Sequence, residues 1–330
     1  MGMYGDAMLE ALGRGAEAAA PHFGLSPRTT VSLLNISENA TFLADDPDAA
    51  APIILRVHRP GYHTKTEILS ELAWIDALRA ERIVDTPEPL ATPNGERLIS
   101  FAHEGEERFV AAFAFMSGDE PKPDADFAAG FQKLGAISAR LHRHARAWPA
   151  PAFFDRKTWS FATTVGSTPH WGPWRAALGL QSDGVALLER LCATLETRLA
   201  AFGGDADRFG LIHADLRLAN LLVDGDRLGV IDFDDCGFGW FVYDFAAAIS
   251  FIEEDPLTSE LQDAWVAGYR SVAPLSVEDE AEIESFILLR RLLLTAWIAS
   301  HAETPTAQEL GTDYTDGTLR LAERYLAVRG

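Results

Sequence analysis

Cysteine is nearly absent from this chain of 330 residues, which contains only Cys192 and Cys236. Neither belongs to a closely spaced cysteine pair, so the sequence offers no structural zinc site and no disulfide framework. Such sparing use of cysteine is typical of proteins in a reducing cytosol, and we therefore expect a cytoplasmic location.

The chain also lacks a run of about 20 apolar residues, the length that spans a bilayer, so we expect no membrane-spanning helix. Residues 1–27 lack the basic segment and the long apolar segment of a signal peptide. Their apolar pattern instead predicts an amphipathic helix that ends near Gly24.

Basic residues are scarce, because Lys and Arg total 28 against 49 Asp and Glu and the formal net charge is -21. Nucleic acids and anionic membranes bind basic protein faces, so we expect neither as a partner. An acidic surface suits solubility, high salt or a cationic small substrate without choosing among them. No pattern in the sequence indicates an oligomeric state.

The order of periodic segments predicts an α+β protein with two lobes. Patterns of β-forming residues predict three strands within residues 30–59, and a helical period follows at residues 64–81. A hairpin turning at "HEGEE" leads to the turn-rich segment "SGDEPKP", where we place the boundary. We expect a β-rich lobe at residues 1–117, with a leading helix at 1–25, and a larger helical lobe at 118–330. The helices expected beyond the boundary lie at 126–147, 184–202, 242–253, 258–272, 278–301 and 313–328.

Polar side chains interrupt the apolar stretch "LIHADLRLANLLV" at residues 211–223. A buried carboxylate is costly unless it is paired or hydrogen-bonded, and capping of loop backbone groups by Asp215 and Asn220 is the ordinary explanation. The following segment "LLVDGDRLGVID" can form a hairpin, which would bring Asn220 close to Asp232. An amide oxygen and a carboxylate are ligands for Mg²⁺, which commonly binds together with nucleotide phosphates.

This spacing resembles the catalytic loop of protein kinases, which is followed by a metal-binding Asp on the next hairpin. The sequence looks like a member of the aminoglycoside phosphotransferase and choline-kinase-like superfamily, nearest the stress-response-kinase and type II homoserine-kinase branch. The stretches that carry the resemblance are "LLNISENATF", "LRVHRPGYHTKTEILSELAWIDAL", "HADLRLANLLV" and "VIDFDDCGFGWFVYDFA". The resemblance implies a bilobal protein-kinase-like fold, ATP and Mg²⁺ as cofactors, and transfer of the γ-phosphoryl group to a hydroxyl.

The resemblance also implies roles for individual residues. Asp215 would orient or deprotonate the acceptor hydroxyl, and Arg217 would offset charge on the transferring phosphoryl group. His213 would brace the loop. Asn220 and Asp232 would hold Mg²⁺.

The strand cation of the resembling kinases is a Lys that binds the α- and β-phosphates, but here the position holds Arg56. Its expected helix partner is Glu71, with Glu67 one turn earlier as the second choice. A guanidinium can bridge phosphate and carboxylate, so we favour an active kinase. The alternative is a weak or inactive ATP-binding homologue, and on its own Arg56 would be an edge-strand surface cation.

Two segments of the N-terminal lobe occupy the places of nucleotide contacts in the resembling kinases. The loop "NISENA" lies between two strands and would touch the β- and γ-phosphates through Ser37, Glu38 and Asn39. The connector "AFAFMSGDEP" would contact the adenine through its backbone and apolar side chains. The connector residues concerned are Phe113, Phe115 and Met116.

The acceptor would bind in front of Asp215, against the helical lobe. A tryptophan-rich stretch is a candidate wall, although such a stretch is more often a core seam; its aromatic residues are Trp159, His170, Trp171 and Trp174. Glu253 and its acidic neighbours are candidates for holding an ammonium group, and a solvated helix end is the commoner explanation. Arg290 and Arg291 lie in an apolar helix, so at least one needs an internal partner, and we assign neither to the site. Asp244 resembles a structural Asp of the family.

The sequence therefore predicts an ATP-dependent small-molecule kinase, and the negative net charge favours an amine-bearing acceptor. Homoserine, an aminoglycoside, a choline-like amine, a sugar and a protein hydroxyl all fit the pattern. A metal-dependent hydrolase that uses Asp215, Asp232 and His213 is a further alternative. It would release phosphate without an acceptor, and it gives no reason for the strand–helix pair that contains Arg56.

Overall fold

The computed structural model describes residues 6–36, 39–122, 127–302 and 304–330. The chain divides into two compact units. The first consists of Met1–Gly118, Pro149–Arg156 and Gly229–Asp234, and the second of Asp119–Trp148, Lys157–Leu228 and Asp235–Gly330. The sequence-based division between residues 117 and 118 assigns a single continuous segment to each lobe, whereas the first unit also includes two short segments from later in the chain.

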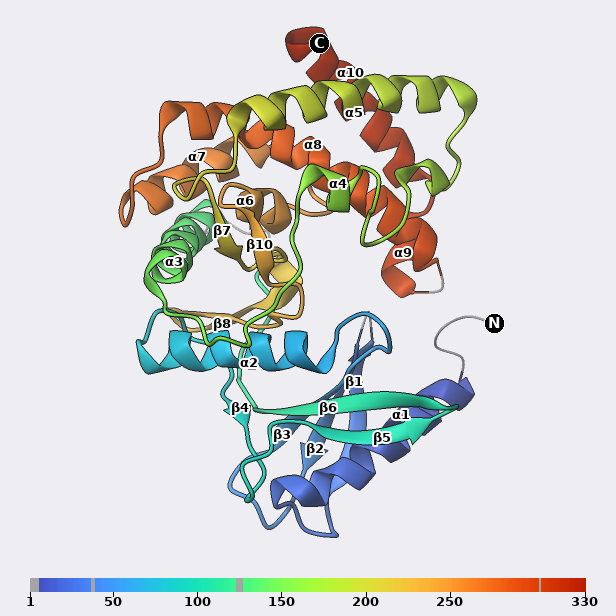
Figure 1. Ribbon diagram of the computed structural model, residues 1–330, viewed down its shortest axis with the longest axis vertical. Coiled ribbons are helices and arrows are strands. Elements are labelled where there is room, and N and C mark those ends of the chain that lie inside the picture. The colour runs from blue at the N-terminus through green and yellow to red at the C-terminus, as the bar shows by residue number, and fades with distance from the viewer. Residues whose placement is uncertain (1–5, 37–38, 123–126, 303) are drawn as a thin grey trace. The chain divides into compact units, whose positions relative to one another are not determined.

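An antiparallel sheet forms most of the first unit (Figure 1). Its strands are β1 (Thr30–Ile36), β2 (Ala40–Asp45), β3 (Ile53–Val57), β6 (Glu106–Ala114) and β4 (Pro89–Leu90) in spatial order, and β5 (Ile99–His103) also pairs with β6. The register places Arg56 on β3 between Thr41 and Ala111. The expected strands and the hairpin at "HEGEE" are confirmed, whereas the short β4 was not predicted.

Two helices belong to the same unit. The leading helix α1 (Asp6–Ala19) continues into the 3-10 turn η1 (Ala20–Phe23) and ends at Gly24, as predicted. It packs on the sheet through small residues, and a Cβ on Gly15 would overlap the ring of Phe101. The second helix, α2 (Lys65–Ala80), begins with a capping box between Thr64 and Glu67. Such a box fixes where a helix begins because it satisfies backbone amides that lack helical partners.

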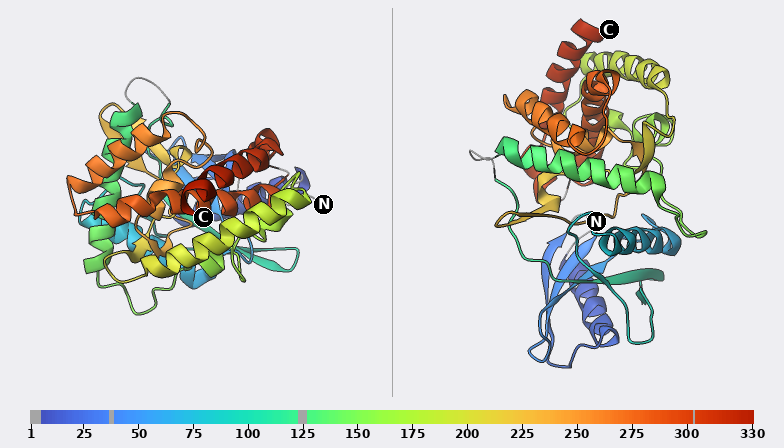
Figure 2. Two further views of the ribbon diagram at one scale, coloured as in Figure 1. Left: turned by 90° about the horizontal axis from the view of Figure 1, so that it is seen from above. Right: turned by 90° about the vertical axis from the view of Figure 1, so that its left-hand side faces the viewer.

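The second unit is mostly helical (Figure 1, Figure 2). Its helical segments are α3 (Phe127–Ala147), α4 (Phe161–Thr164), η2 (Trp174–Ala176), α5 (Ser182–Phe202), α6 (Tyr243–Ala248), α7 (Thr258–Arg270), α8 (Val277–Ser300), α9 (Pro305–Leu310) and α10 (Asp313–Arg329). Helices α3 and α7 approach closely because Gly135 faces the backbone of Trp265, and Gly268 faces that of Gln132. Helices α4 and α9 were not predicted, and the helix expected at 242–253 ends at Ala248.

Two small antiparallel ladders carry the polar loop noted in the sequence. Strand β7 (Phe209–Ile212) pairs with β10 (Gly237–Trp240), and β8 (Leu221–Asp224) pairs with β9 (Arg227–Val230) as the predicted hairpin. Residues 213–220 connect β7 to β8 and end in the short turn η3 (Leu218–Asn220). The α+β class is thus confirmed. In the described part of the chain, no helix is both long and apolar enough to cross a membrane.

Candidate active site

The loop after β7 is held in an unusual backbone conformation. Ala214 has a φ of 66°, a left-handed value that costs a residue with a Cβ roughly 1–2 kcal/mol. The buried carboxylate of Asp244 accepts hydrogen bonds from the backbone nitrogens of Ala214 at 2.7 Å and His213 at 3.3 Å. These bonds oppose the strain and fix the start of the loop, which is the structural role expected for Asp244.

Asp244 is itself oriented by a buried histidine on α3. Nε2 of His142 lies 2.9 Å from a carboxylate oxygen of Asp244, and Nδ1 lies 3.1 Å from the hydroxyl of Tyr269. Burial lowers the pKa of His142, with the carboxylate opposing the shift. The ring therefore favours the neutral form, which donates its Nε2 proton to Asp244 and accepts from Tyr269.

Asp215 lies at the centre of a cluster of charged and polar groups. Its Oδ1 is 2.5 Å from Nη2 of Arg290, and its Oδ2 is 3.2 Å from Nε of Arg217 and 2.7 Å from Nδ2 of Asn220. The ring nitrogen Nδ1 of the buried His213 accepts a hydrogen bond from the backbone nitrogen of Asp215 at 3.3 Å. The structure thus brings together four of the residues expected at the site and adds Arg290.

The electrostatic balance keeps Asp215 ionised. Burial alone would raise the pKa of its carboxyl group, but the charges of Arg217 and Arg290 outweigh burial and the pKa lies below its usual value. An ionised carboxylate accepts hydrogen bonds only, so it suits the binding of a hydroxyl group.

The amide of Asn220 has a defined orientation. Its Nδ2 donates both to the backbone oxygen of Asp215 at 2.8 Å and to Oδ2 of the same residue at 2.7 Å. Because both partners are acceptors, the network assigns the nitrogen to this side, and the amide oxygen points the other way. That oxygen has the chemistry of a Mg²⁺ ligand.

A second charged cluster lies within the first unit, around Arg56. The two carboxylate oxygens of Glu71 are each 2.6 Å from Nη2 of Arg56, and Oδ1 of Asp232 is 3.1 Å from Nη1. The Arg56 guanidinium also lies 4.9 Å from the ring centre of Phe113. Of the two acidic residues considered as its partner, Glu71 makes the pair, whereas Glu67 caps α2.

Three carboxylates share the charge of Arg56. Burial by itself would lower the pKa of this guanidinium, but Glu71, Asp234 and Asp232 raise it above its usual value. The side chain of Asp232 is 39% exposed, whereas those of Glu71 and Asp234 are buried. Asp232 is therefore the member of this cluster that is accessible to a bound ion or phosphate.

Asp234 has two further partners that the sequence did not reveal. Its two carboxylate oxygens lie 3.4 Å from Nδ1 of His58 and 3.4 Å from Nε2 of His63. Burial would raise the pKa of Asp234, but His63, His58 and Arg56 hold it well below its usual value. The loop between β3 and α2 is thereby attached to the segment that contains Asp232.

The remaining residues that the sequence predicts to contact the nucleotide differ in burial and in hydrogen-bond partners. Ser37 and Glu38 lie outside the described residues, and Oδ1 of Asn39 accepts a hydrogen bond from the backbone of Arg59 at 3.0 Å. In the connector, the backbone nitrogen of Ala114 already donates to the backbone oxygen of Glu88 at 2.8 Å. Phe113 lies in β6 and is buried, whereas the exposed Phe115 and the half-buried Met116 follow the end of that strand.

The candidate acceptor residues are mostly core residues. Trp159, Trp171 and Trp174 are buried, and the rings of the first two meet edge to face, 5.5 Å apart. Glu253 is also buried and is paired with Arg291 and the hydroxyl of Tyr314, so it forms an internal ion pair and not a solvated helix end.

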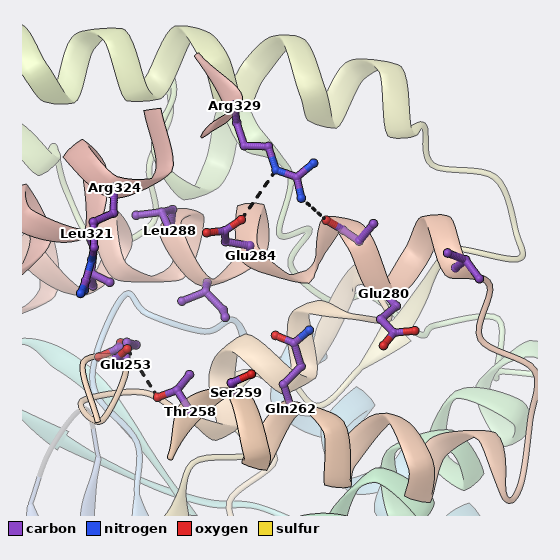
Figure 3. A pocket seen from close by; sticks show the side chains of 13 residues that line it. Glu253, Thr258, Ser259, Gln262, Glu280, Glu284, Leu288, Leu321, Arg324 and Arg329 are labelled. Atoms are coloured by element: carbon purple, nitrogen blue, oxygen red, sulfur yellow. Dashed lines mark hydrogen bonds and ion pairs between the residues drawn. The ribbon is translucent and has the colours of Figure 1, made fainter. Parts of the chain in front are cut away.

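A cavity of about 640 Å³ lies between helices α7, α8 and α10 of the second unit (Figure 3). Polar side chains including Glu280, Glu284 and Arg324 line it together with apolar ones such as Leu288. Among the described residues, those of the Asp215 cluster are not part of its lining. We therefore base the candidate catalytic site of the second unit on the Asp215 cluster and describe the Arg56 cluster of the first unit by itself.

Comparison with known proteins identifies the family of this chain. A profile of the phosphotransferase enzyme family matches residues 31–280. The chain belongs to this family. The resemblance found in the sequence is thus confirmed.

One solved structure, described as the microcompartment-associated aminopropanol kinase, is 45% identical and has a TM-score of 0.88, covering 96% of this chain and 98% of that one. The structure of amicoumacin kinase hAmiN with AMP-PNP, Ca²⁺ and Ami is 22% identical, with a TM-score of 0.76 over 97% and 93% of the two chains. A homoserine kinase of Neisseria meningitidis is 30% identical over 157 residues, 44% of this chain and 46% of that protein. The fold is thus that of protein-kinase-like phosphotransferases, and the chain is a kinase-type phosphotransferase.

Proposed function

We propose that this protein transfers the γ-phosphoryl group of ATP to the hydroxyl of a small amino alcohol, with aminopropanol as the first candidate. The observation that carries the proposal is the ionised Asp215, held by Arg217, Arg290 and Asn220. The carboxylate of Asp215 accepts a hydrogen bond from the hydroxyl group of the small molecule. This bond directs the hydroxyl oxygen toward the phosphorus atom. The adjacent guanidinium of Arg217 offsets charge on the phosphoryl oxygens.

Asn220 and Asp232 are the residues that would hold Mg²⁺, and their oxygens fit a hard cation. Mg²⁺ held by these residues would supply positive charge that offsets the charge of the phosphate oxygens. Among the described residues, no group of three or more His, Cys, Asp or Glu side chains is arranged to hold a metal by itself. Amicoumacin kinase hAmiN was solved with AMP-PNP and Ca²⁺, which supports an ion that binds together with nucleotide phosphates.

Arg56 is the proposed cation for the α- and β-phosphates. Its pairing with Glu71 supports an active nucleotide site, because the guanidinium is fixed by a buried carboxylate and retains donors for other oxygens. Ser37, Glu38 and Asn39 stay proposed phosphate contacts, and Phe113, Phe115 and Met116 stay proposed adenine contacts. An inactive homologue is the competing proposal, and only the replacement of Lys by Arg56 favours it.

Two observations support the proposal of an amine-bearing acceptor. The net charge of -21 favours a cationic acceptor over an anionic one, and the 45% identical relative is described as an aminopropanol kinase. Homoserine is the second candidate, because a homoserine kinase shares a stretch of this sequence. The carboxylate of homoserine would need a cation, but the buried guanidinium of Arg290 is engaged by Asp215 and that of Arg291 by Glu253.

The test is a panel of acceptors assayed with Mg-ATP and the purified full chain. The panel contains aminopropanol isomers, ethanolamine, choline, homoserine and propanediol, which keeps the hydroxyl without the amine. We expect acceptor-dependent ADP formation with aminopropanol and at least about tenfold lower kcat/KM with propanediol, the equivalent of about 1.4 kcal/mol. An equal kcat/KM for propanediol and aminopropanol would show that the protein does not recognise the amine. Phosphate release without any acceptor would favour a hydrolase.

A further inference from the structure

The two carboxylate oxygens of Asp215 differ in the number of hydrogen bonds they accept. Oδ2 accepts from Arg217 and from Asn220, whereas Oδ1 accepts from Arg290. A carboxylate oxygen has two lone pairs, so Oδ2 is saturated and Oδ1 retains one acceptor position. The side chain of Asp215 is 14% exposed, so an acceptor hydroxyl can approach it.

Arg290 is buried and held by several contacts. Its side chain is 1% exposed. Its Nε donates to the hydroxyl of Ser250 at 3.2 Å, and its Nη1 lies 3.3 Å from the oxygen of Ala214 and 3.4 Å from the hydroxyl of Tyr243. The guanidinium also lies 5.1 Å from the ring centre of Trp171.

These contacts come from several elements, so the guanidinium has little freedom to move. It contacts both the strained residue Ala214 and the carboxylate that follows it. A planar group with several fixed donors orients a carboxylate more strictly than a point charge does.

We propose that Arg290 is a positioning residue for phosphoryl transfer, which fixes Oδ1 of Asp215 as the oxygen that receives the acceptor hydroxyl. This proposal rests on the kinase function proposed above. Arg290 acts through Asp215 and does not itself touch the substrate. The ATP side of the reaction does not depend on it.

The competing explanation is that Arg290 is only a buried structural ion pair, and the chain provides a matched control for it. Arg291 is the next residue of α8, is 2% exposed, and pairs with the carboxylate of Glu253 at 2.5 Å. Its guanidinium also lies 3.5 Å from the ring centre of Tyr314. Removal of either arginine breaks a buried ion pair, but only Arg290 contacts Asp215.

The experiment compares Arg290→Lys and Arg290→Met with Arg291→Lys and Arg291→Met in the full chain. We expect Arg290→Met to lower kcat about 100-fold, because a small displacement of a reacting group has that cost, while the KM for ATP changes less than about threefold. Arg290→Lys should restore some of the lost kcat. The Arg291 variants should lower the midpoint of thermal unfolding by a similar amount and keep kcat within about threefold of the unsubstituted protein.

Crystal structures of the same variants with Mg-ADP provide a second measurement. We expect the Asp215 carboxylate to rotate in both Arg290 variants and to keep its place in both Arg291 variants. Parallel losses of kcat at both positions, or an unmoved Asp215 in Arg290→Met, would overturn the proposal. If the unsubstituted protein phosphorylates nothing in the acceptor panel, the proposed function fails, and the position of Asp215 in the crystals still decides whether Arg290 fixes Oδ1.

Discussion

The charged cluster around Arg56 and the one around Asp215 both consist of guanidinium and carboxylate groups, but in opposite proportions. In the first unit, one guanidinium lies among the carboxylates of Glu71, Asp232 and Asp234. In the second unit, one carboxylate lies between the guanidinium groups of Arg217 and Arg290.

The surplus charge suits each cluster to a different ligand. An excess of carboxylate has the chemistry that suits a divalent cation, and the exposed member of the Arg56 cluster, Asp232, is the residue proposed to bind one. Excess guanidinium around Asp215 keeps that carboxylate ionised and is favourable for a phosphoryl group that carries negative charge. The predictions below test this division, beginning with the largest expected effect.

Replacement of Asp215 by Asn should remove phosphoryl transfer and leave nucleotide binding intact. The amide keeps the size of the side chain but loses the charge that accepts the hydroxyl proton, so we expect kcat to fall about 10²–10⁴-fold. Calorimetric titration with Mg-AMP-PNP should give an unchanged affinity. Equal losses of turnover and nucleotide affinity would show that Asp215 does not act on the acceptor alone.

Replacement of Asp232 by Ala should remove the metal-dependent component of nucleotide binding. A ligand at 100 times its Kd stabilises a protein by about 2.7 kcal/mol, and we expect most of the stabilisation by Mg-ATP to disappear in a thermal-shift measurement. Asp224→Ala is the control, because Asp224 is an exposed carboxylate of the β8–β9 hairpin. The metal assignment is contradicted if both variants retain the full Mg-ATP shift.

Two replacements of Arg56 distinguish the contribution of its positive charge from that of the guanidinium shape. Arg56→Ala leaves Glu71 buried without its cation, so we expect nucleotide affinity to fall about tenfold and unfolding free energy to fall by about 3–5 kcal/mol. Arg56→Lys keeps the charge, and we expect activity to be retained or improved. Unchanged nucleotide affinity in the Ala variant would remove Arg56 from the site, and a severe loss in the Lys variant would show that the site requires a guanidinium.

The smallest effect is expected at His63, which contacts Asp234, two residues along the chain from the proposed metal ligand Asp232. His63→Phe keeps an aromatic ring of similar size and removes one polar partner, so urea unfolding should show a loss of about 1–2 kcal/mol. The KM for ATP should change less than about threefold. The exposed His22 provides the control His22→Phe, which should leave unfolding unchanged, and a larger effect there than at His63 would contradict the assignment.

Local sequence patterns predicted the helices and hairpins that depend on residues close together in the sequence. The helix at α2 and the β8–β9 hairpin follow from a helical period and from turn residues. The pairing of Arg56 with Glu71 was instead implied by the resemblance to a known family. The resemblance to a known family also selected the loop that contains Asp215 and Asn220.

Contacts between distant segments were not predictable in the same way. Helix α8 is apolar around its circumference, so its periodicity cannot tell which of Arg290 and Arg291 faces Asp215. The approach of His58 and His63 to Asp234 depends on how the β3–α2 loop folds over a segment far along the chain. Such pairs are set by tertiary packing and leave no periodic signal.

The most direct test of the central claim is ³¹P NMR of the unsubstituted protein and Asp215→Asn, each with Mg-ATP and aminopropanol. The account predicts a phosphomonoester signal that grows with ADP, requires aminopropanol, and is absent with the Asn variant. ATP that stays intact, or that yields only inorganic phosphate, would contradict the account.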